Sequence, residues 1–319
     1  MRLVYFGSGA FGLPTLAALA ARFQLAAVVT QPDKPAGRGG HLTPTPVAAW
    51  VTRECPQIPV LKPEKVNDPS VVAKLRDLGA DAWIVIAFGQ KLGKSLLEGV
   101  FAINLHASLL PRWRGAAPIN AAIVAGDAIT GNSVITLADR MDAGLVLGQS
   151  QRSLGSELTA GDLHDQLAAD GPGLVLSVLK RQEAGTLEPT TQAEASVTIA
   201  PKLSKSDGWV DFRDPADACR RRIHGLTPWP GVTVRFRQSD LKLARVEVCF
   251  QSPEPHSMEG SVIDPVRGIV ECGSGTALRI IEVIPAGRKS MRWEDFARGQ
   301  RVQKGEPLSG RQGGQGRPC

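Results

Sequence analysis

Short apolar runs alternate with stretches of helical periodicity through the first 182 residues of this 319-residue chain. Continuous runs of about four to eight apolar residues are typical of strands buried on both faces of a parallel sheet. The expected strands cover residues 2–6, 25–30, 58–61, 82–87, 103–106, 133–137 and 145–149. The expected helices cover residues 13–23, 47–54, 70–78, 116–125 and 163–182. This alternation predicts an α/β domain with a doubly wound, Rossmann-like parallel sheet.

The pattern changes after a polar stretch at residues 185–205, which has no apolar period and is interpreted as a linker. One helical stretch at 215–224 follows, and then short β-rich runs lie between Gly/Pro turns, at 232–237, 241–250, 260–263, 268–271 and 277–283. Such runs predict a smaller, OB-like β-barrel. The predicted organisation is a catalytic domain at 1–184, the linker at 185–205, a C-terminal barrel at 206–308 and a flexible tail at 309–319.

A glycine-rich turn follows the first expected strand. Gly7, Gly9 and Gly12 satisfy G-x-G-x-x-G, and Asp33 lies 21 residues beyond Gly12, as in a dinucleotide-binding fingerprint. Asp33 stands in a proline-broken loop, however, and glycines also allow a tight strand-to-helix turn with close packing. We favour the packing interpretation and keep a nicotinamide cofactor as the alternative.

Two polar side chains end the strand expected at 103–106. Asn104 and His106 lie two positions apart, and therefore on one face of that strand, while Asp142 stands in the turn between two later strands. An amide donor, an imidazole and a carboxylate are the groups that acyl transfer to an amine requires, for oxyanion stabilisation, proton exchange and orientation of the ring. Taken as isolated residues, a structural His106 and a turn Asp142 remain the simpler interpretation.

Composition and charge narrow the class of protein. Hydrophobic content of 43%, without any apolar run near the roughly 20 residues of a membrane helix, predicts a globular cytoplasmic protein with no membrane association. The five cysteines are odd in number and form no C-x-x-C, so we expect neither disulfides nor a metal site.

Residues 205–319 carry 19 Lys and Arg against 14 Asp and Glu. This basic half predicts a polyanionic partner, and a solvated basic face is the alternative.

Several segments, taken in their order along the chain, resemble the methionyl-tRNA formyltransferase family. They are FGSGAFGLPTLAAL, VVTQPDKPAGRGGHLTPTPV, IVIAFGQKL, INLHASLLPRWRGAAPI, MDAGLVLGQ, KLSKSDGWVDF, TPWPG and GRKSMRWEDFARG. The resemblance implies an enzyme that transfers the formyl group of 10-formyltetrahydrofolate to the free α-amino group of initiator methionyl-tRNA, for translation initiation and without a metal. It also implies a monomer in the cytoplasm.

The resemblance assigns roles to particular residues. The family's catalytic trio corresponds to Asn104, His106 and Asp142. Its tetrahydrofolate-binding residues correspond to Ser108, Leu109, Leu110 and Pro111, together with Ile86, Phe88, Gly89 and Leu92. Its tRNA-contacting loop corresponds to Arg38, Gly39 and His41.

The chain departs from the family pattern in its basic loop. Gly40 and His41 stand where two lysines usually follow Gly-Arg-Gly, which predicts a weaker or differently placed grip on phosphate. In the barrel we expect Trp209 and Trp229 to belong to the core. The basic residues expected to contact phosphates there are Arg220, Arg221, Arg222, Arg235, Arg237, Lys242, Arg245, Arg288, Lys289 and Arg292.

Three other functions remain open at this point. A formyltransferase acting on an amino-sugar nucleotide would share the chemistry of the first domain. A nicotinamide-dependent oxidoreductase would use the glycine-rich turn. A non-enzymatic RNA-binding protein would use only the basic second half.

Overall fold

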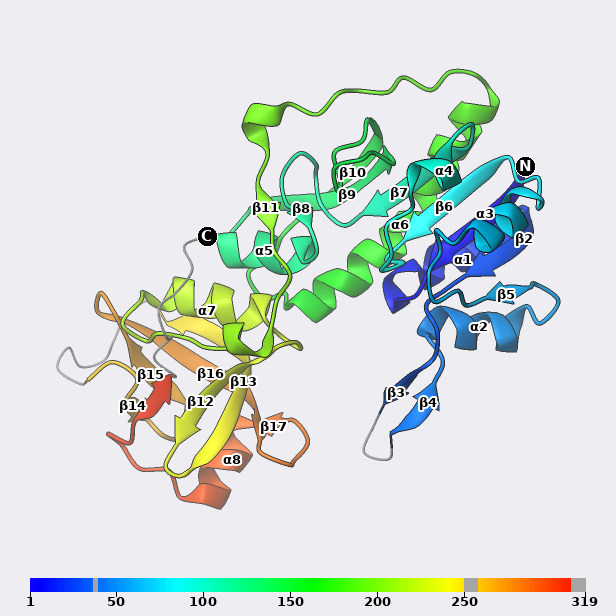
Figure 1. The fold of residues 1–319 in the computed structure, drawn as a ribbon. Coiled ribbons are helices and arrows are strands. Elements are labelled where there is room, and N and C mark those ends of the chain that lie inside the picture. Colours follow the sequence, from blue (N-terminus) through cyan, green and yellow to red (C-terminus); the bar gives the residue numbers. More distant parts are fainter. Residues whose placement is uncertain (37–39, 250–257, 311–319) are drawn as a thin grey trace. The chain divides into compact units, whose positions relative to one another are not determined.

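A computed structural model describes residues 1–36, 40–249 and 258–310 of the chain, which divide into two compact units (Figure 1). Unit 1 comprises residues 1–115, 130–152 and 164–199, and unit 2 comprises 116–129, 153–163 and the described residues from 200 onward. Unit 2 therefore includes two short segments that precede residue 164. The domain boundaries drawn above, at 184/185 and 205/206, stay a prediction. Residues 311–319 of the expected tail lie outside the described residues.

Unit 1 is built on a seven-stranded sheet in the order β10-β9-β7-β6-β1-β2-β5 (Figure 1). The strands are β1 (Arg2–Gly7), β2 (Gln24–Val29), β5 (Val60–Leu61), β6 (Ala82–Ile86), β7 (Phe101–His106), β9 (Ile129–Thr136) and β10 (Val146–Ser153). β5, β2, β1, β6 and β7 run parallel, and β9 is antiparallel to β7. The predicted Rossmann-like sheet is confirmed, with an antiparallel addition beyond β7.

Helices connect these strands and supply the apolar cover of the sheet. They are α1 (Leu13–Ala20), α2 (Pro46–Glu54), α3 (Pro69–Arg76), α4 (Lys94–Leu97) and most of α6 (Ala160–Glu183), with the 3-10 turns η1 (Ala10–Gly12) and η2 (Glu194–Ser196). On one face Phe6 and Trp83 lie 5.2 Å apart between ring centroids, in a cluster with Leu75 of α3. Their neighbours Tyr5 and Ile84 face the other way and are also fully buried. Burial on both faces explains why the strands are continuously apolar.

The turn between β1 and η1 is shaped by one tyrosine. The Tyr5 hydroxyl donates to the Gly12 carbonyl at 3.1 Å, and burial raises the pKa of the phenol, which keeps it a neutral donor. A Cβ at Gly12 would lie 2.0 Å from that hydroxyl oxygen, and one at Gly7 would lie 2.6 Å from Tyr5 Cε1. A Cβ at Gly9 would meet only Ala87 Cβ, at an ordinary 3.6 Å. Two of the three glycines therefore make room for Tyr5, as the packing interpretation expects.

Unit 2 is an antiparallel sheet in the order β14-β15-β16-β13-β12-β18 that curls toward a barrel. Its strands are β12 (Val232–Phe236), β13 (Ser239–Cys249), β14 (Val262–Asp264), β15 (Ile269–Cys272), β16 (Thr276–Pro285), β17 (Met291–Arg292), which pairs with β16, and β18 (Leu308–Gly310). A bridge between Ser261 and Pro307 joins the two edges of the sheet. The predicted small β-barrel is confirmed.

Three helices belong to unit 2: α5 (Pro118–Ala125), α7 (Ala216–Gly225) and α8 (Trp293–Gln300), with the turn η3 (Lys205–Asp207). α8 is absent from the sequence-based prediction, although its Trp293 is fully buried in the barrel core. The expectation that Trp229 lies in the core is wrong, because it is 51% exposed. Trp209 is half-buried, with the Arg222 guanidinium 3.7 Å from its ring centroid.

Two short ribbons also differ from expectation. The region of Asp33 and His41, described above as loop, contains the strands β3 (Lys34–Ala36) and β4 (His41–Thr43), which pair in antiparallel fashion. β8 (Arg114–Gly115) pairs with β11 (Ile199–Ala200), inside the region predicted as a linker. Strands of two or three residues are too short to leave a periodic signal in the sequence.

His224 of α7 is a buried, neutral part of unit 2. It is 2% exposed, its Nε2 accepts from the Val246 amide at 3.1 Å, and its Nδ1 lies 3.2 Å from the Ser156 carbonyl, to which it donates. Burial, and next the nearby Arg220, lower the pKa of His224 to about 4.

We expect His224 to make stability fall as the pH drops from about 6.5 to about 4. In that window the unfolded chain binds a proton at His224 and the folded chain does not, so the neutral ring contributes up to about 3 kcal/mol above the window and nothing below it. Urea unfolding across this pH range measures the effect. The slope of stability against pH should be smaller in His224→Gln, and an equal slope in both proteins would contradict the assignment.

Gly12→Ala should destabilise the protein by about 1–3 kcal/mol, because its Cβ overpacks against the Tyr5 hydroxyl. Gly9→Ala is the matched control and should change stability by less than about 0.5 kcal/mol. In a Tyr5→Phe background the clashing oxygen is gone, so the cost of Gly12→Ala should shrink by at least about 0.5 kcal/mol. Chemical denaturation of the single and double variants measures this coupling. Additive costs would show that Tyr5 is not the reason for the glycine.

Candidate active site

The end of β7 presents Asn104 and His106 on one face, as the alternation predicts. Asn104 is half-buried, and no hydrogen bond to its amide is found among the described residues. His106 is 6% exposed, and its Nε2 lies 2.9 Å from the Trp113 carbonyl oxygen. A carbonyl only accepts, so Nε2 carries a hydrogen and donates it. Nδ1 is then the nitrogen that can gain or lose a proton.

Asp142 faces that nitrogen. Its Oδ2 lies 3.7 Å from His106 Nδ1 and accepts from the Gly115 amide at 2.9 Å. Asp142 occupies the turn between β9 and β10 with a φ of 54°, which non-glycine residues rarely adopt. Close approach of the chain also fixes this turn, because a Cβ at Gly144 would lie 1.7 Å from the Thr136 carbonyl oxygen. The structure therefore brings the predicted trio to one end of β7.

A buried amide holds the Asp142 turn in place. Gln192 Nε2 donates to the carbonyls of Asp142 and Gly144, both at 2.8 Å. Gln192 Oε1 in turn accepts from Arg114 Nε at 2.9 Å, and Gln192 and Arg114 are 6% and 3% exposed. The other end of Arg114 pairs with Glu194 at 3.0 Å, and this hydrogen bond is the largest cause that lowers the pKa of the Glu194 carboxyl.

Neither Gln192 nor Arg114 has a definite role predicted from the sequence. Gln192 lies 50 residues from Asp142, in the stretch expected to be a linker, and nothing local distinguishes it from a surface glutamine. Arg114 lies within INLHASLLPRWRGAAPI, whose unusual composition is the one available signal. Its guanidinium braces the site, whereas that of Arg112 lies over the Trp113 ring, 4.9 Å from the centroid.

The expected folate segment, Ser108 to Pro111, is a loop braced by hydrogen bonds. Ser108 Oγ donates to the Arg112 carbonyl at 2.7 Å, and Ser133 Oγ donates to the Ser108 carbonyl at 2.6 Å. Leu110 N in turn donates to Ser133 Oγ at 3.0 Å. Ser108 and Leu110 are buried, and Leu109 and Pro111 are half-buried. The latter two are thus the members of this segment with accessible side chains.

The other expected folate residues also divide into buried and accessible ones. Ile86, Phe88 and Leu92 are 0%, 2% and 6% exposed, so their side chains belong to the core. Gly89 is exposed, with a φ of 87°. The Gln31 Nε2 atom lies 3.7 Å from the position that a Gly89 Cβ would take. This nitrogen is buried and has no hydrogen-bond partner among the described residues. Gln31 is therefore a further polar group at this strand end, and no sequence motif marks it.

The three expected tRNA-contacting residues are only partly described. Arg38 and Gly39 lie outside the described residues, and His41 is exposed on β4. Asp33, the candidate ribose-binding acid of the nicotinamide alternative, is ion-paired with Lys62 Nζ at 2.7 Å.

Within the described ranges no group of three or more His, Cys, Asp and Glu is placed to hold a metal ion. No helix in the described part of the chain is long and apolar enough to cross a membrane.

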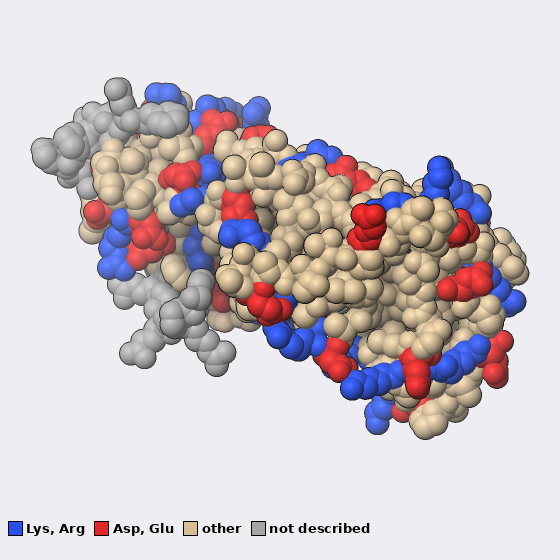
Figure 2. All heavy atoms as spheres, turned by 90° about the horizontal axis from the view of Figure 1, so that it is seen from above, with Lys and Arg blue, Asp and Glu red and all other residues tan. Residues whose placement is uncertain are grey.

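Most basic residues expected to bind phosphate on unit 2 are engaged with protein groups. Ion pairs join Arg220 and Arg221 to Asp217, Arg235 to Asp240, Arg237 to Glu306, Arg245 to Asp162 and Arg292 to Glu294. Arg222 and Lys242 donate to backbone carbonyls. Figure 2 shows a face on which Lys and Arg lie beside Asp and Glu. For Arg288 and Lys289, no side-chain partner is found among the described residues.

Comparison with known proteins adds solved structures of similar fold. The N-formyltransferase of Helicobacter canadensis, in complex with folinic acid and dTDP-3-aminofucose, superposes with a TM-score of 0.66 at 14% identity, over 88% of this chain and 98% of that one. HypX of Aquifex aeolicus, in complex with tetrahydrofolic acid, gives a TM-score of 0.61 at 15% identity, over 93% of this chain. This chain spans 47% of the length of HypX. At these identities the likeness concerns the fold alone.

Sequence relatives cover nearly the whole chain. Residues 1–179 match the Formyl transferase family, and residues 202–301 match the Formyl transferase C-terminal domain. The methionyl-tRNA formyltransferase of Symbiobacterium thermophilum is 40% identical over 314 residues, which are 97% of this chain and 95% of that protein. That of Geobacter metallireducens is 40% identical over 308 residues, 96% of this chain and 97% of that protein. The chain belongs to the methionyl-tRNA formyltransferase family.

Proposed function

We propose that this protein transfers the formyl group of 10-formyltetrahydrofolate to the α-amino group of initiator methionyl-tRNA. The observation that carries the proposal is the end of β7, where the Asn104 amide, without a partner among the described residues, stands beside the His106–Asp142 pair. Curated relatives at 40% identity bear the name of this activity. An amide donor, a proton-exchanging ring and a carboxylate are sufficient for formyl transfer to an amine.

The proposed mechanism assigns one task to each side chain. The amine attacks the formyl carbon, so a C–N bond forms and the carbonyl electron pair moves to oxygen. The Asn104 amide donates to this oxyanion. His106 takes the amine proton at Nδ1, because its Nε2–H is engaged by the Trp113 carbonyl, and the protonated Nδ1 then donates to the oxyanion.

The same proton serves the departure of the folate. When the bond between the formyl carbon and the folate nitrogen breaks, that nitrogen takes the proton from His106, and the oxygen returns its electron pair to the carbonyl. Asp142 stabilises the protonated ring from 3.7 Å without itself becoming protonated. The ring is thereby returned to its neutral state for the next cycle.

We assign the two substrates to surfaces around this trio. The folate contacts the accessible side chains of Leu109 and Pro111 and the exposed backbone at Gly89, while Ser108, Leu110, Ile86, Phe88 and Leu92 support these surfaces from within the core. The acceptor end of the tRNA contacts the β3–β4 ribbon through His41 and through Arg38 and Gly39, which follow β3 in the sequence. Because one chain supplies all three catalytic groups, we propose a monomer, acting in the cytoplasm where its tRNA substrate is used.

Purified protein should convert charged initiator tRNA and 10-formyltetrahydrofolate to N-formylmethionyl-tRNA. Asn104→Ala and His106→Ala should each lower kcat roughly 10²- to 10³-fold, because each removes a group that stabilises the oxyanion. Acid-gel separation of formylated and unformylated tRNA measures the rate, and unchanged thermal unfolding shows that the fold persists. Full activity of both variants would overturn the mechanism. Formylation of an amino-sugar nucleotide in place of methionyl-tRNA would overturn the assigned acceptor.

Gln192→Glu should lower kcat about tenfold or more with little change in either KM. The carboxylate keeps the shape and still accepts from Arg114, but it cannot donate to the carbonyls of Asp142 and Gly144, so Asp142 loses its position opposite His106. Glu194→Gln is the matched control, since it alters the exposed end of the same network, and it should stay within about twofold. A Gln192→Glu enzyme with the wild-type kcat and pH profile would contradict this role.

A further inference from the structure

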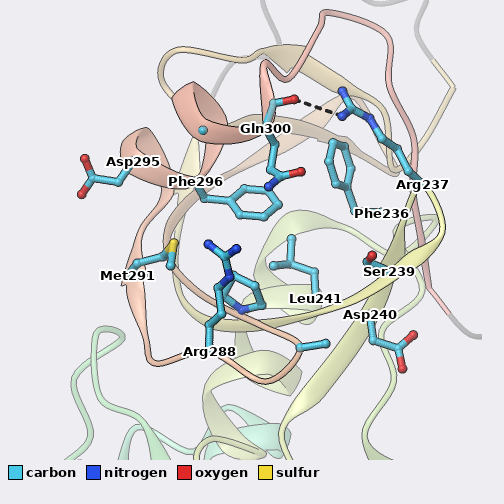
Figure 3. Close-up of a pocket in the computed structure, with 13 residues that line it drawn as sticks. Phe236, Arg237, Ser239, Asp240, Leu241, Arg288, Met291, Asp295, Phe296 and Gln300 are labelled. Carbon is cyan, nitrogen blue, oxygen red and sulfur yellow. Dashed lines mark hydrogen bonds between the residues drawn. The ribbon is translucent and has the colours of Figure 1, made fainter.

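Unit 2 contains a cavity of its own, of about 300 Å³ (Figure 3). Three segments form its walls: the start of β13 with Ser239, the β16–β17 loop with Arg288, and the end of α8 with Gln300. A volume of about 300 Å³ lies at the small end of the range for ligand sites. It suits a single flat ring system better than a larger metabolite.

The floor of this cavity is apolar and rigid. Phe236, Leu241 and Phe296 are 3%, 1% and 6% exposed, and their remaining surface meets the cavity. The Phe236 and Phe296 rings lie edge to face, 5.6 Å apart between centroids and inclined at 66°. They belong to the same core cluster as Trp293, so the floor does not collapse when the cavity is empty.

The rim carries two polar side chains that make no interaction within the described residues. The Arg288 guanidinium and the Gln300 amide both point into the space beside Phe296, whereas the carboxylates of Asp240 and Asp295 point away from it (Figure 3). Those two acids have cationic partners, Arg235 at 3.0 Å and Arg298 at 4.0 Å. The free charge at the mouth is therefore positive, and exposed Lys289 adds to it.

We infer that this cavity binds one unpaired nucleobase of the tRNA substrate. Proteins read unpaired RNA bases by stacking them on aromatic or guanidinium planes and by hydrogen-bonding their edges. Here Arg288 supplies the plane, the floor supplies the apolar contact, and the Gln300 amide supplies one donor and one acceptor for the base edge. The positive mouth accommodates the adjoining phosphates. The inference rests on the proposed function, which makes a tRNA the partner of this domain.

Steady-state kinetics of the full chain with methionyl-tRNA, at saturating 10-formyltetrahydrofolate, tests the inference. Arg288→Lys keeps the positive charge but removes the planar guanidinium on which the base stacks. Gln300→Ala removes the amide that hydrogen-bonds the edge of the base. Each should raise the KM for methionyl-tRNA about 5- to 10-fold with kcat unchanged, as expected for the loss of a stacked base. Ala286→Trp, which fills the cavity from its rim, should have the same effect. Arg267→Ala, an exposed turn arginine away from the cavity, is the control and should stay within about twofold.

The outcomes separate this inference from its alternatives. If Arg288→Ala raises KM and lowers its salt dependence by about one contact while Arg288→Lys matches the wild type, the arginine only meets a phosphate and the nucleobase site is wrong. Wild-type KM in Arg288→Lys, Gln300→Ala and Ala286→Trp would equally overturn it. Both results presuppose that the wild-type chain formylates methionyl-tRNA. Absence of that activity would reject the proposed function instead.

Discussion

One buried amide ties together the parts of the site that the chain keeps far apart in sequence. Gln192 donates to two carbonyls of the Asp142 turn and accepts from buried Arg114, which lies eight residues beyond the end of β7 at His106. The Asp142 backbone has a positive φ, which costs on the order of 1–3 kcal/mol for a non-glycine residue unless the surroundings hold it. The Gln192 bonds hold the backbone of this turn, and the Gly115 amide holds the carboxylate itself opposite His106. The geometry of the trio therefore depends on a residue outside it.

Hydrogen bonds, more than apolar contacts, shape the loops around the site. Ser133 Oγ alone donates to the Ser108 carbonyl and accepts from Leu110 N and Gln149 Nε2. The Tyr5 hydroxyl braces the turn after β1 by donating to the Gly12 carbonyl. Loops cannot bury enough apolar surface to be rigid by packing alone, and their backbone polar groups must find partners. Polar residues behind these loops are therefore part of how the site is positioned.

The sequence predicts the features that repeat along the chain and misses those that depend on distant partners. The parallel strands follow from continuous apolar runs, and the shared face of Asn104 and His106 follows from strand alternation. α8 was missed because its apolar residues, Trp293, Phe296 and Ala297, have helical spacing over only eight residues. Trp229, expected in the core, is exposed, whereas the side chains of Phe88 and Leu92, which stay predicted folate residues, are buried. Apolar character alone does not tell a pocket wall from a core residue.

Residue type also does not show which basic side chains are already ion-paired within the protein. The basic second half predicts a polyanionic partner, but counting arginines overstates how many are available, since six of the basic residues expected to bind phosphate form ion pairs within unit 2. An arginine already paired with a carboxylate must give up that pair before it meets a phosphate, which removes much of the gain. Arg288 and Lys289, adjacent on one loop, carry no such cost. Recognition of an anionic partner by unit 2 therefore depends more on a few unpaired basic side chains at one place than on its total positive charge.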